Sequence, residues 1–226
     1  MSAAELTAEL PCGGVLFTDR FDGNMSSVGG DGHEHGAANR GRLRERLGLQ
    51  ALARGYQVHG STVRIVASMP EREAEVGELE DADGQATALP GLGAMVLAAD
   101  CLPIAIATDG AVAMVHAGWR GLAGGVIERG LAAVRELDGG EVIAALGPCA
   151  GPCCYEVGPE VHATLGTGVE DKAPADLREI ARSRLEKAGV GSVILLGGCT
   201  ICDERFFSHR REGVRAGRQA GVAWLS

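Results

Sequence analysis

The stretch Ala94-Met-Val-Leu-Ala-Ala-Asp-Cys-Leu-Pro-Ile-Ala-Ile-Ala107 decides the fold of this chain. Asp100 separates two apolar runs, and Pro103 resets the backbone before the second run. Nearly continuous apolar runs of this kind are typical of strands that are covered on both faces. Cys101 lies in the kink between the runs, where two buried strands would hold its thiol in place. The stretch therefore predicts two core strands that meet at a candidate site.

Similar patterns on either side of this stretch predict the remaining elements. Apolar runs predict further strands over residues 15–18, 62–67, 111–115, 142–146 and 193–196. Helical spacing of apolar residues predicts helices before Gly48, within residues 124–137, over residues 159–165 and after Asp176, which is an N-cap residue. Because strands and helices alternate irregularly, we expect one mixed α/β domain over residues 1–226.

Composition and charge narrow the classes of partner. The chain has 226 residues and a formal net charge of −9, so we expect no nucleic-acid partner, which usually needs a basic patch. Its start has no signal segment, and its longest apolar stretch, residues 94–107, is shorter than the roughly 20 residues that span a bilayer. We therefore expect no membrane partner and a cytoplasmic protein. Its seven cysteines should then be reduced, and Cys12, Cys149 and Cys153 are interpreted as small buried apolar residues.

Three separate motifs supply a candidate metal centre. His59 lies in Gln57-Val-His-Gly60, Cys101 in Ala99-Asp-Cys-Leu-Pro103, and His116 in His116-Ala-Gly-Trp-Arg-Gly121. Each residue alone is more often part of a core. Together, two imidazoles and a thiolate form a three-ligand set, and zinc with three protein ligands keeps a fourth position open for water or substrate. The joint pattern therefore predicts a catalytic metal held by His59, Cys101 and His116.

The residues next to these ligands admit two interpretations each. Asp100 would either accept a hydrogen bond from a histidine ligand or tie down its own turn. Arg120 lies on a glycine-flanked turn into a helix, which offers a guanidinium and backbone N–H groups to an oxyanion such as phosphate; the alternative is a surface ion pair. Trp119 would either stack on a planar base or pack against the protein.

Other uses of the same residue types remain open. Without a metal, Cys101 would be a nucleophile and His116 or His59 its base, as in thiol hydrolases. A zinc ion that only clamps the fold would need a fourth protein ligand, and the candidates are His162, His209 and Cys202. His33 and His35 form a His-x-His pair in residues 23–36, which are interpreted as a mobile, solvated loop.

The chain resembles the multicopper polyphenol oxidase or laccase-like family, whose members are now described as purine nucleoside phosphorylases. The resemblance covers nearly the whole length, and the three long motifs around His59, Cys101 and His116 are its most specific part. The further matching segments are Phe17-Thr-Asp-Arg20, Asn39-Arg40, Asp83-Gly84, Gly147-Pro148, Cys154-Tyr-Glu-Val157, Cys199-Thr200 and Arg205-Phe-Phe-Ser-His-Arg-Arg211.

This resemblance implies phosphorolysis of adenosine, inosine and methylthioadenosine, and deamination of adenosine to inosine. It implies a four-layer α/β/β/α sandwich and zinc, with copper in some members. The family's metal ligands fall on His59, Cys101 and His116, and its substrate-side arginine and asparagine fall on Arg20 and Asn39. The expected partners are a purine nucleoside and phosphate, for a chain that acts as a monomer or homodimer. The older family name implies copper-dependent phenol oxidation instead, but six histidines are too few for the several coppers of a laccase.

The chain departs from the family pattern in two places. Residues 21–38 are short and polar and lack the family's Gly-Gly-Val-Ser turn and Leu-Asn-Leu strand, which bears on the substrate range if this loop lines the pocket. His209 stands where a tyrosine is common. The implied reaction needs cationic or N–H donors for phosphate, and deamination needs an activated water, which a metal supplies. Arg120 joins Arg20 and Asn39 as a candidate substrate residue.

Overall fold

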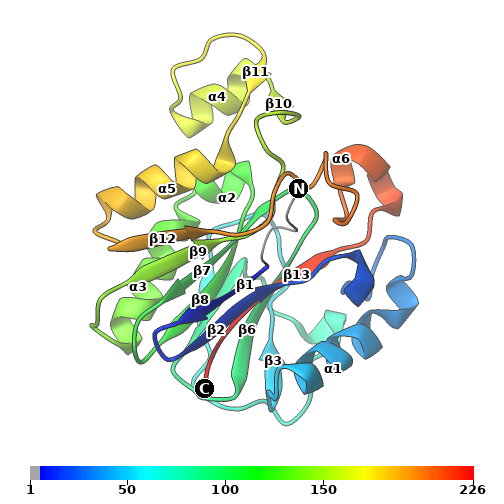
Figure 1. The fold of residues 1–226 in the computed structure, drawn as a ribbon, viewed down its shortest axis with the longest axis vertical. Helices are drawn as coiled ribbons and strands as arrows, with labels where there is room; N and C mark the ends of the chain where they lie inside the picture. Colours follow the sequence, from blue (N-terminus) through cyan, green and yellow to red (C-terminus); the bar gives the residue numbers. More distant parts are fainter. Residues whose placement is uncertain (1–5) are drawn as a thin grey trace.

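The computed structural model describes residues 6–226, which form two large β-sheets with helices on their outer faces (Figure 1). The five-stranded sheet has the order β1 (Thr7–Leu10), β2 (Gly13–Phe17), β13 (Gln219–Leu225), β6 (Leu92–Ala98) and β3 (Ala51–Ala53). The six-stranded sheet has the order β12 (Ser192–Leu195), β9 (Ile143–Leu146), β7 (Leu102–Ala107), β8 (Val112–Ala117), β5 (Gly84–Thr87) and β4 (Val63–Ile65).

The two sheets pack face to face through small and medium apolar side chains. Phe17 and Val96 of the five-stranded sheet share one buried cluster with Ala105, Val112 and Met114 of the other sheet. Alternate residues of the same strands face outward, as the two-residue period of a strand requires. In the six-stranded sheet these are residues such as Ile104, Ile106, Ala113 and Val115, and they pack under helices.

Helices cover both outer faces and complete four layers. The six-stranded sheet is covered by α3 (Val126–Leu137) and α5 (Leu177–Lys187), and the five-stranded sheet by α1 (Gly36–Arg46) (Figure 1). The mixed α/β class and the implied α/β/β/α sandwich are therefore confirmed. The shorter elements are α2 (Trp119–Ala123), α4 (Pro159–Leu165), α6 (His209–Glu212), β10 (Glu156–Val157), β11 (Ala173–Pro174), and the 3-10 turns η1 (Arg20–Asp22), η2 (His33–His35), η3 (Val76–Glu78) and η4 (Gly213–Arg215).

The predicted strands and helices are present, with shifted ends. The decisive stretch forms β6 and β7, which belong to different sheets, so the kink at Asp100 carries the chain from one layer to the other. The helix predicted within residues 124–137 is α3, which begins at Val126 because its N-cap residue Gly125 has a left-handed backbone (φ 84°). The capping role of Asp176 is confirmed, since its carboxylate accepts a hydrogen bond from the backbone N–H of Glu179 (3.0 Å).

The glycine-rich loop over residues 23–36 is partly buried in the protein core. Met25 is fully buried in the cluster under α1, and Asn24 accepts backbone hydrogen bonds from Ser26 and Arg218 (2.9 Å each). The interpretation of this segment as a solvated loop was wrong for residues 24–26, since Met25 packs in the core and Asn24 is fixed by these hydrogen bonds. Within residues 6–226, no helix is long and apolar enough to cross a membrane.

Candidate metal centre and substrate cavity

Three elements bring the predicted ligands together. Cys101 follows the β6–β7 kink, and the antiparallel register of β7 and β8 pairs Leu102 with Ala117, which places Cys101 beside His116. His59 arrives from the loop between β3 and β4 in a left-handed conformation (φ 59°). One ligand atom from each residue lies within 4.8 Å of the others, although the residues are distant in the sequence. The structure thus brings all three predicted residues to one point.

Asp83 organises this centre. One oxygen of its buried carboxylate accepts a hydrogen bond from Nδ1 of His116 (2.8 Å) and from the backbone N–H of His59 (3.0 Å). The other oxygen accepts from the N–H groups of Val58 (3.1 Å) and Gly60 (2.7 Å). Since a carboxylate only accepts, Nδ1 of His116 carries the proton and Nε2 is left with its lone pair for a metal.

The donor set and the space around it fit a metal ion with an open position. Gly118 follows β8, and a Cβ atom there would lie 3.0 Å from Sγ of Cys101 and 3.3 Å from Cδ2 of His59. The missing side chain therefore keeps the space next to the ligands clear. A His₂Cys set with room for one more ligand matches the catalytic type of zinc site.

The pKa values of Cys101 and His116 also favour the binding of a cation, because they favour the thiolate form of Cys101. Burial raises the pKa of the Cys101 thiol, but the neighbouring His116 and His59 outweigh burial and hold this pKa at about 6. Burial lowers the pKa of His116, but the Cys101 thiolate and Asp83 raise it to about 9. Without a metal, the two side chains are thus an ion pair, and the thiolate form that a metal needs is already favoured.

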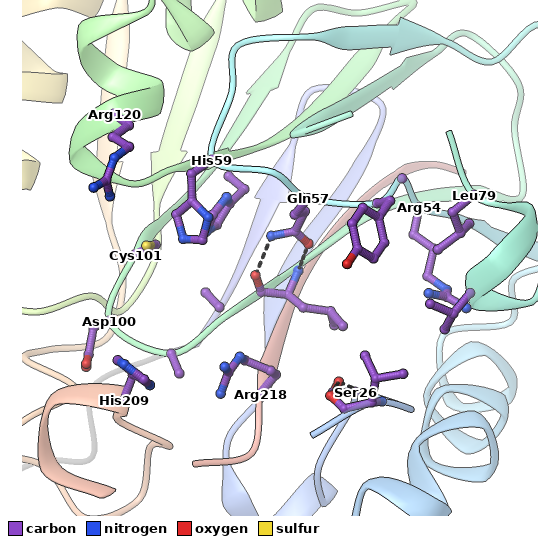
Figure 2. A pocket seen from close by; sticks show the side chains of 18 of the residues that line it. Ser26, Arg54, Gln57, His59, Leu79, Asp100, Cys101, Arg120, His209 and Arg218 are labelled. Carbon is purple, nitrogen blue, oxygen red and sulfur yellow. Dashed lines mark hydrogen bonds between the residues drawn. The ribbon is translucent and has the colours of Figure 1, made fainter. Parts of the chain in front are cut away.

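A cavity of about 470 Å³ opens in front of these ligands. Pockets for small molecules commonly have volumes of about 300–1,000 Å³. In Figure 2, His59 and Cys101 lie on one wall, and Arg218 and Ser26 face them from below. The amide of Gln57 is fixed between them by two backbone hydrogen bonds with Leu97 (2.7 Å each). The loop over residues 21–38 contributes Ser26, Ser27 and Val28 to the lining, so its departure from the family pattern lies at the cavity.

Several arginines give the cavity a positive lining despite the negative net charge. Arg54 is paired with Glu73 (2.9 Å), whereas Arg120, Arg210 and Arg218 form no ion pair with a carboxylate within residues 6–226. Among the described residues, Arg120 therefore does not form the surface ion pair that was its alternative interpretation; its guanidinium stacks on the ring of Trp119 (4.2 Å). The guanidinium groups of these three arginines can bind an anion such as phosphate.

Arg20 and Asn39 lie away from this cavity lining. Arg20 forms an ion pair with Glu212, donates to the carbonyl oxygen of Glu204 (3.0 Å) and stacks on Phe207 (4.5 Å). Asn39 is buried and donates to the carbonyl oxygen of Asn24 (2.7 Å). Both side chains hold the polypeptide together in this structure, and contact of either with a substrate stays a prediction.

Asp100 does not serve either of its two predicted roles. Its carboxylate accepts hydrogen bonds from Oγ1 of Thr200 (2.6 Å) and the backbone N–H of Arg210 (2.6 Å), so it joins the β6–β7 connection, which carries Cys101, to the C-terminal segment. The histidine ligand is held by Asp83 instead. Asp83 was visible only as part of an Asp-Gly pair before an undetected strand, and no local signal links it to His116.

Among the other candidates, His209 lines the same cavity but does not join the group of three ligands, whereas the remaining histidines and Cys202 lie outside the cavity lining. His33 and His35 are exposed and share no described metal-capable group, and His162 bonds to Thr167 (2.9 Å) and the carbonyl of Ala173 (3.1 Å). Within residues 6–226, no fourth histidine, cysteine or carboxylate joins the group of three ligands. Of the three cysteines interpreted as buried, Cys149 is buried, whereas Cys12 and Cys153 are exposed, because both lie in surface turns.

Comparison with known proteins places the chain in one family and agrees with its fold. The family model described as "Multi-copper polyphenol oxidoreductase laccase" matches residues 12–226, and the chain belongs to this family. A relative from Xylella fastidiosa (strain Temecula1) that is named purine nucleoside phosphorylase is 43% identical, with 92% of this chain and 85% of the relative covered. The Escherichia coli K12 protein named purine nucleoside phosphorylase YfiH is 33% identical, with coverage of 94% and 90%. The crystal structure of Neisseria meningitidis protein NMB0706 superposes with a TM-score of 0.82 at 31% identity over 98% of both chains.

Proposed function

We propose that residues 1–226 form one catalytic domain of a purine nucleoside phosphorylase that also deaminates adenosine. Its substrates are adenosine, inosine and methylthioadenosine with phosphate, and its metal is zinc held by His59, Cys101 and His116. The observation that carries this proposal is the meeting of these three side chains at the wall of an arginine-lined cavity. The names of the Xylella and Escherichia relatives support the phosphorylase part of this proposal.

Two imidazoles and a thiolate are suitable ligands for zinc, and the proposal gives the metal one chemical role. A bound zinc ion supplies a Lewis acid and lowers the pKa of water for deamination. The protein holds the ligands in place: Asp83 fixes the ring of His116 and the backbone around His59, so neither ligand has to reorganise on binding. Copper is the other metal that two imidazoles and a thiolate accept.

The cationic side chains of the cavity bind the second substrate in this proposal. Phosphorolysis breaks the glycosidic bond with oxocarbenium character while phosphate attacks, so phosphate must be held close and in line. Arg120 and Arg218 lie on opposite sides of the ligand wall in Figure 2, and neither has a carboxylate partner within the described residues. We assign them to phosphate, together with Arg210, which lines the same cavity. The rings of Tyr56 and Trp119 line the same space and can pack against a purine.

Product analysis tests the activity directly. Purified, zinc-loaded protein is incubated with adenosine, with and without phosphate. Adenine and ribose 1-phosphate should appear only with phosphate, and inosine should appear in either case. Cys101→Ala should lose both products, whereas Cys12→Ala, which alters an exposed cysteine outside the cavity lining, should keep them. No turnover of any purine nucleoside by the zinc-loaded protein would end the proposal.

A metal-free alternative has one observation in its favour, the ion pair of Cys101 with His116. In a thiol hydrolase this pair would attack an acyl substrate. Chelation separates the two functions. Loss of activity on removal of zinc, and its return with added zinc, supports the phosphorylase, whereas activity that resists chelators and is blocked by thiol alkylation supports the nucleophile.

A further inference from the structure

A second group of sulfur atoms lies outside the site described above. Cys153 and Cys154 follow β9, and Cys199 and Cys202 follow β12. Because β9 and β12 are parallel neighbours, their carboxyl ends meet at one edge of the sheet, and the two loops start side by side. A backbone bridge between Cys149 and Cys199 continues this pairing beyond the strands. The topology thus brings two cysteine pairs from distant parts of the sequence to one place.

The four sulfur atoms are packed as ligands of a single ion would be. All four lie within 4.8 Å of one another, with Sγ of Cys202 3.3 Å from Cys153 and 2.9 Å from Cys154. A tetrahedral zinc ion with zinc–sulfur bonds of about 2.3 Å places its ligand sulfurs roughly 3.8 Å apart. Small adjustments reach that geometry. A cluster of several irons would need the sulfurs to be spread around more than one metal, and the group is too compact for it.

The backbone around this group is shaped for a thiolate. The N–H of Gly151 donates to Sγ of Cys199 (3.2 Å). A Cβ atom on Gly151 would lie 3.1 Å from Cβ of Cys199, so the close approach of the two loops relies on that glycine. The spacing Cys199-Thr-Ile-Cys202 is the Cys-x-x-Cys pattern of structural zinc sites.

We propose that Cys153, Cys154, Cys199 and Cys202 bind a second zinc ion, which is structural and has no open position. Four protein ligands close the coordination sphere, in contrast to the three-ligand centre at Cys101. Disulfides are the less suitable use of the group, because Cys202 faces both Cys153 and Cys154 and can bond with only one of them.

This ion would fix one wall of the substrate cavity. Cys154 adjoins Tyr155, whose ring lies under the guanidinium of Arg210 (5.2 Å), and both side chains line the cavity. On the other loop, Arg211 donates to the carbonyl oxygens of Thr200 and Ile201 (2.8 Å each), and Thr200 holds Asp100 next to the metal ligand Cys101. The second zinc would therefore join the two loops from which this wall is built.

Zinc counting in variants of the whole protein tests the inference. The protein is prepared with excess zinc, desalted and analysed by plasma mass spectrometry. We expect two zinc ions per chain in the unaltered protein, one in Cys101→Ala and one in Cys202→Ser. Cobalt loading of Cys101→Ala should give the intense visible absorption of a tetrathiolate site, and this absorption should be absent from the double variant Cys101→Ala, Cys202→Ser.

The outcomes separate this site from the proposed activity. Cys101→Ala leaves all four sulfurs in place, so the test holds even if Cys202→Ser fails to fold. A Cys101→Ala protein that binds no zinc under reducing conditions, that contains iron instead, or that shows a disulfide by mass spectrometry would overturn the inference. Absence of phosphorolysis in a protein that still binds a tetrathiolate zinc would refute the proposed function alone.

Discussion

At the scale of single residues, one carboxylate and one glycine shape the proposed metal centre. Asp83 accepts four hydrogen bonds from the segment around His59 and from His116, so it fixes two of the three ligands at once. Gly118 supplies the free space beside the ligand atoms. Neither residue contributes a ligand atom. Asp83 fixes the positions of two ligands, and Gly118 leaves room beside them.

Asp83→Asn should weaken zinc binding at the three-ligand centre. An amide has one accepting oxygen instead of two, so the shell around His116 and His59 loses hydrogen bonds, and loss of such outer contacts commonly costs about 10–100-fold in metal affinity. Competition with a chromophoric chelator measures this, in a Cys202→Ser background so that one site is titrated. Asp171→Asn, at an exposed position, should bind like its parent. Equal affinities would show that Asp83 does not position the ligands.

Gly118→Ala should disturb the centre by crowding, without backbone strain. Its φ of −71° is open to any residue, so the cost comes from the new methyl group at 3.0 Å from Sγ of Cys101. Overpacking of this kind typically destabilises by about 1–3 kcal/mol. Denaturant unfolding and chelator competition should both report a loss relative to Gly139→Ala, where nothing lies near the new atom. An unchanged zinc affinity would contradict the role assigned to this space.

At the scale of elements, strand register and helix caps position the site. The hairpin of β7 and β8 sets Cys101 beside His116, and the parallel pairing of β9 with β12 sets the two cysteine loops side by side. On the outer face, α5 is held by its cap at Asp176 and by Leu177, Ala181 and Leu185 in the core. Its Arg178 donates to the carbonyl oxygens of Gly147 (2.7 Å) and Leu196 (2.6 Å), directly before the two cysteine loops.

Asp176→Ala should lower the free energy of unfolding by about 1 kcal/mol, because the N–H of Glu179 loses its capping acceptor. Urea denaturation followed by circular dichroism measures the change. The matched control is Asp171→Ala, which removes an exposed aspartate outside any helix. A loss of the same size in both variants would mean that the cap contributes nothing specific to α5.

At the scale of the whole molecule, the two ends of the chain are interlocked. β13 lies between β2 and β6 in the centre of its sheet, and Arg20 near one end forms an ion pair with Glu212 near the other. Burial raises the pKa of Glu212, but hydrogen bonds from Arg20 and Arg211 outweigh burial and hold this pKa below its usual range. The ionised form of Glu212 therefore contributes to the contact between the two ends of the chain.

Acid should weaken the protein in part through Glu212. Because the folded pKa lies below the unfolded value of about 4.3, the contribution is complete above that pH and is lost as the pH falls through the folded pKa. Unfolding free energies measured from pH 6 downward should fall less steeply for Glu212→Gln than for the unaltered chain, with a lower starting value. Glu9→Gln, at an exposed position, should follow the unaltered chain. Parallel curves for all three proteins would contradict this linkage.

Features that depend on residues close together in the sequence could be predicted, and features that depend on residues far apart in the sequence could not. The strands at β7 and β8 and the capped α5 were predicted because their patterns are local and periodic. β13 was missed, because its Gly221 and small alanines give no clear alternation, although it is the central strand of its sheet. Cys199 and Cys202 carried a readable spacing, but their partners Cys153 and Cys154 lie far away in the sequence.

By itself, the sequence determined the mixed α/β class, the family and the three candidate ligands, since these rest on periodicity and on motifs that are continuous in the chain. Only the tertiary structure decided that Asp83 rather than Asp100 holds His116, that Arg218 faces the ligands across a cavity, and that four cysteines share one point. The physical reason is that these contacts depend on strand register and on the packing of two sheets. Neither is encoded in the few residues around each side chain.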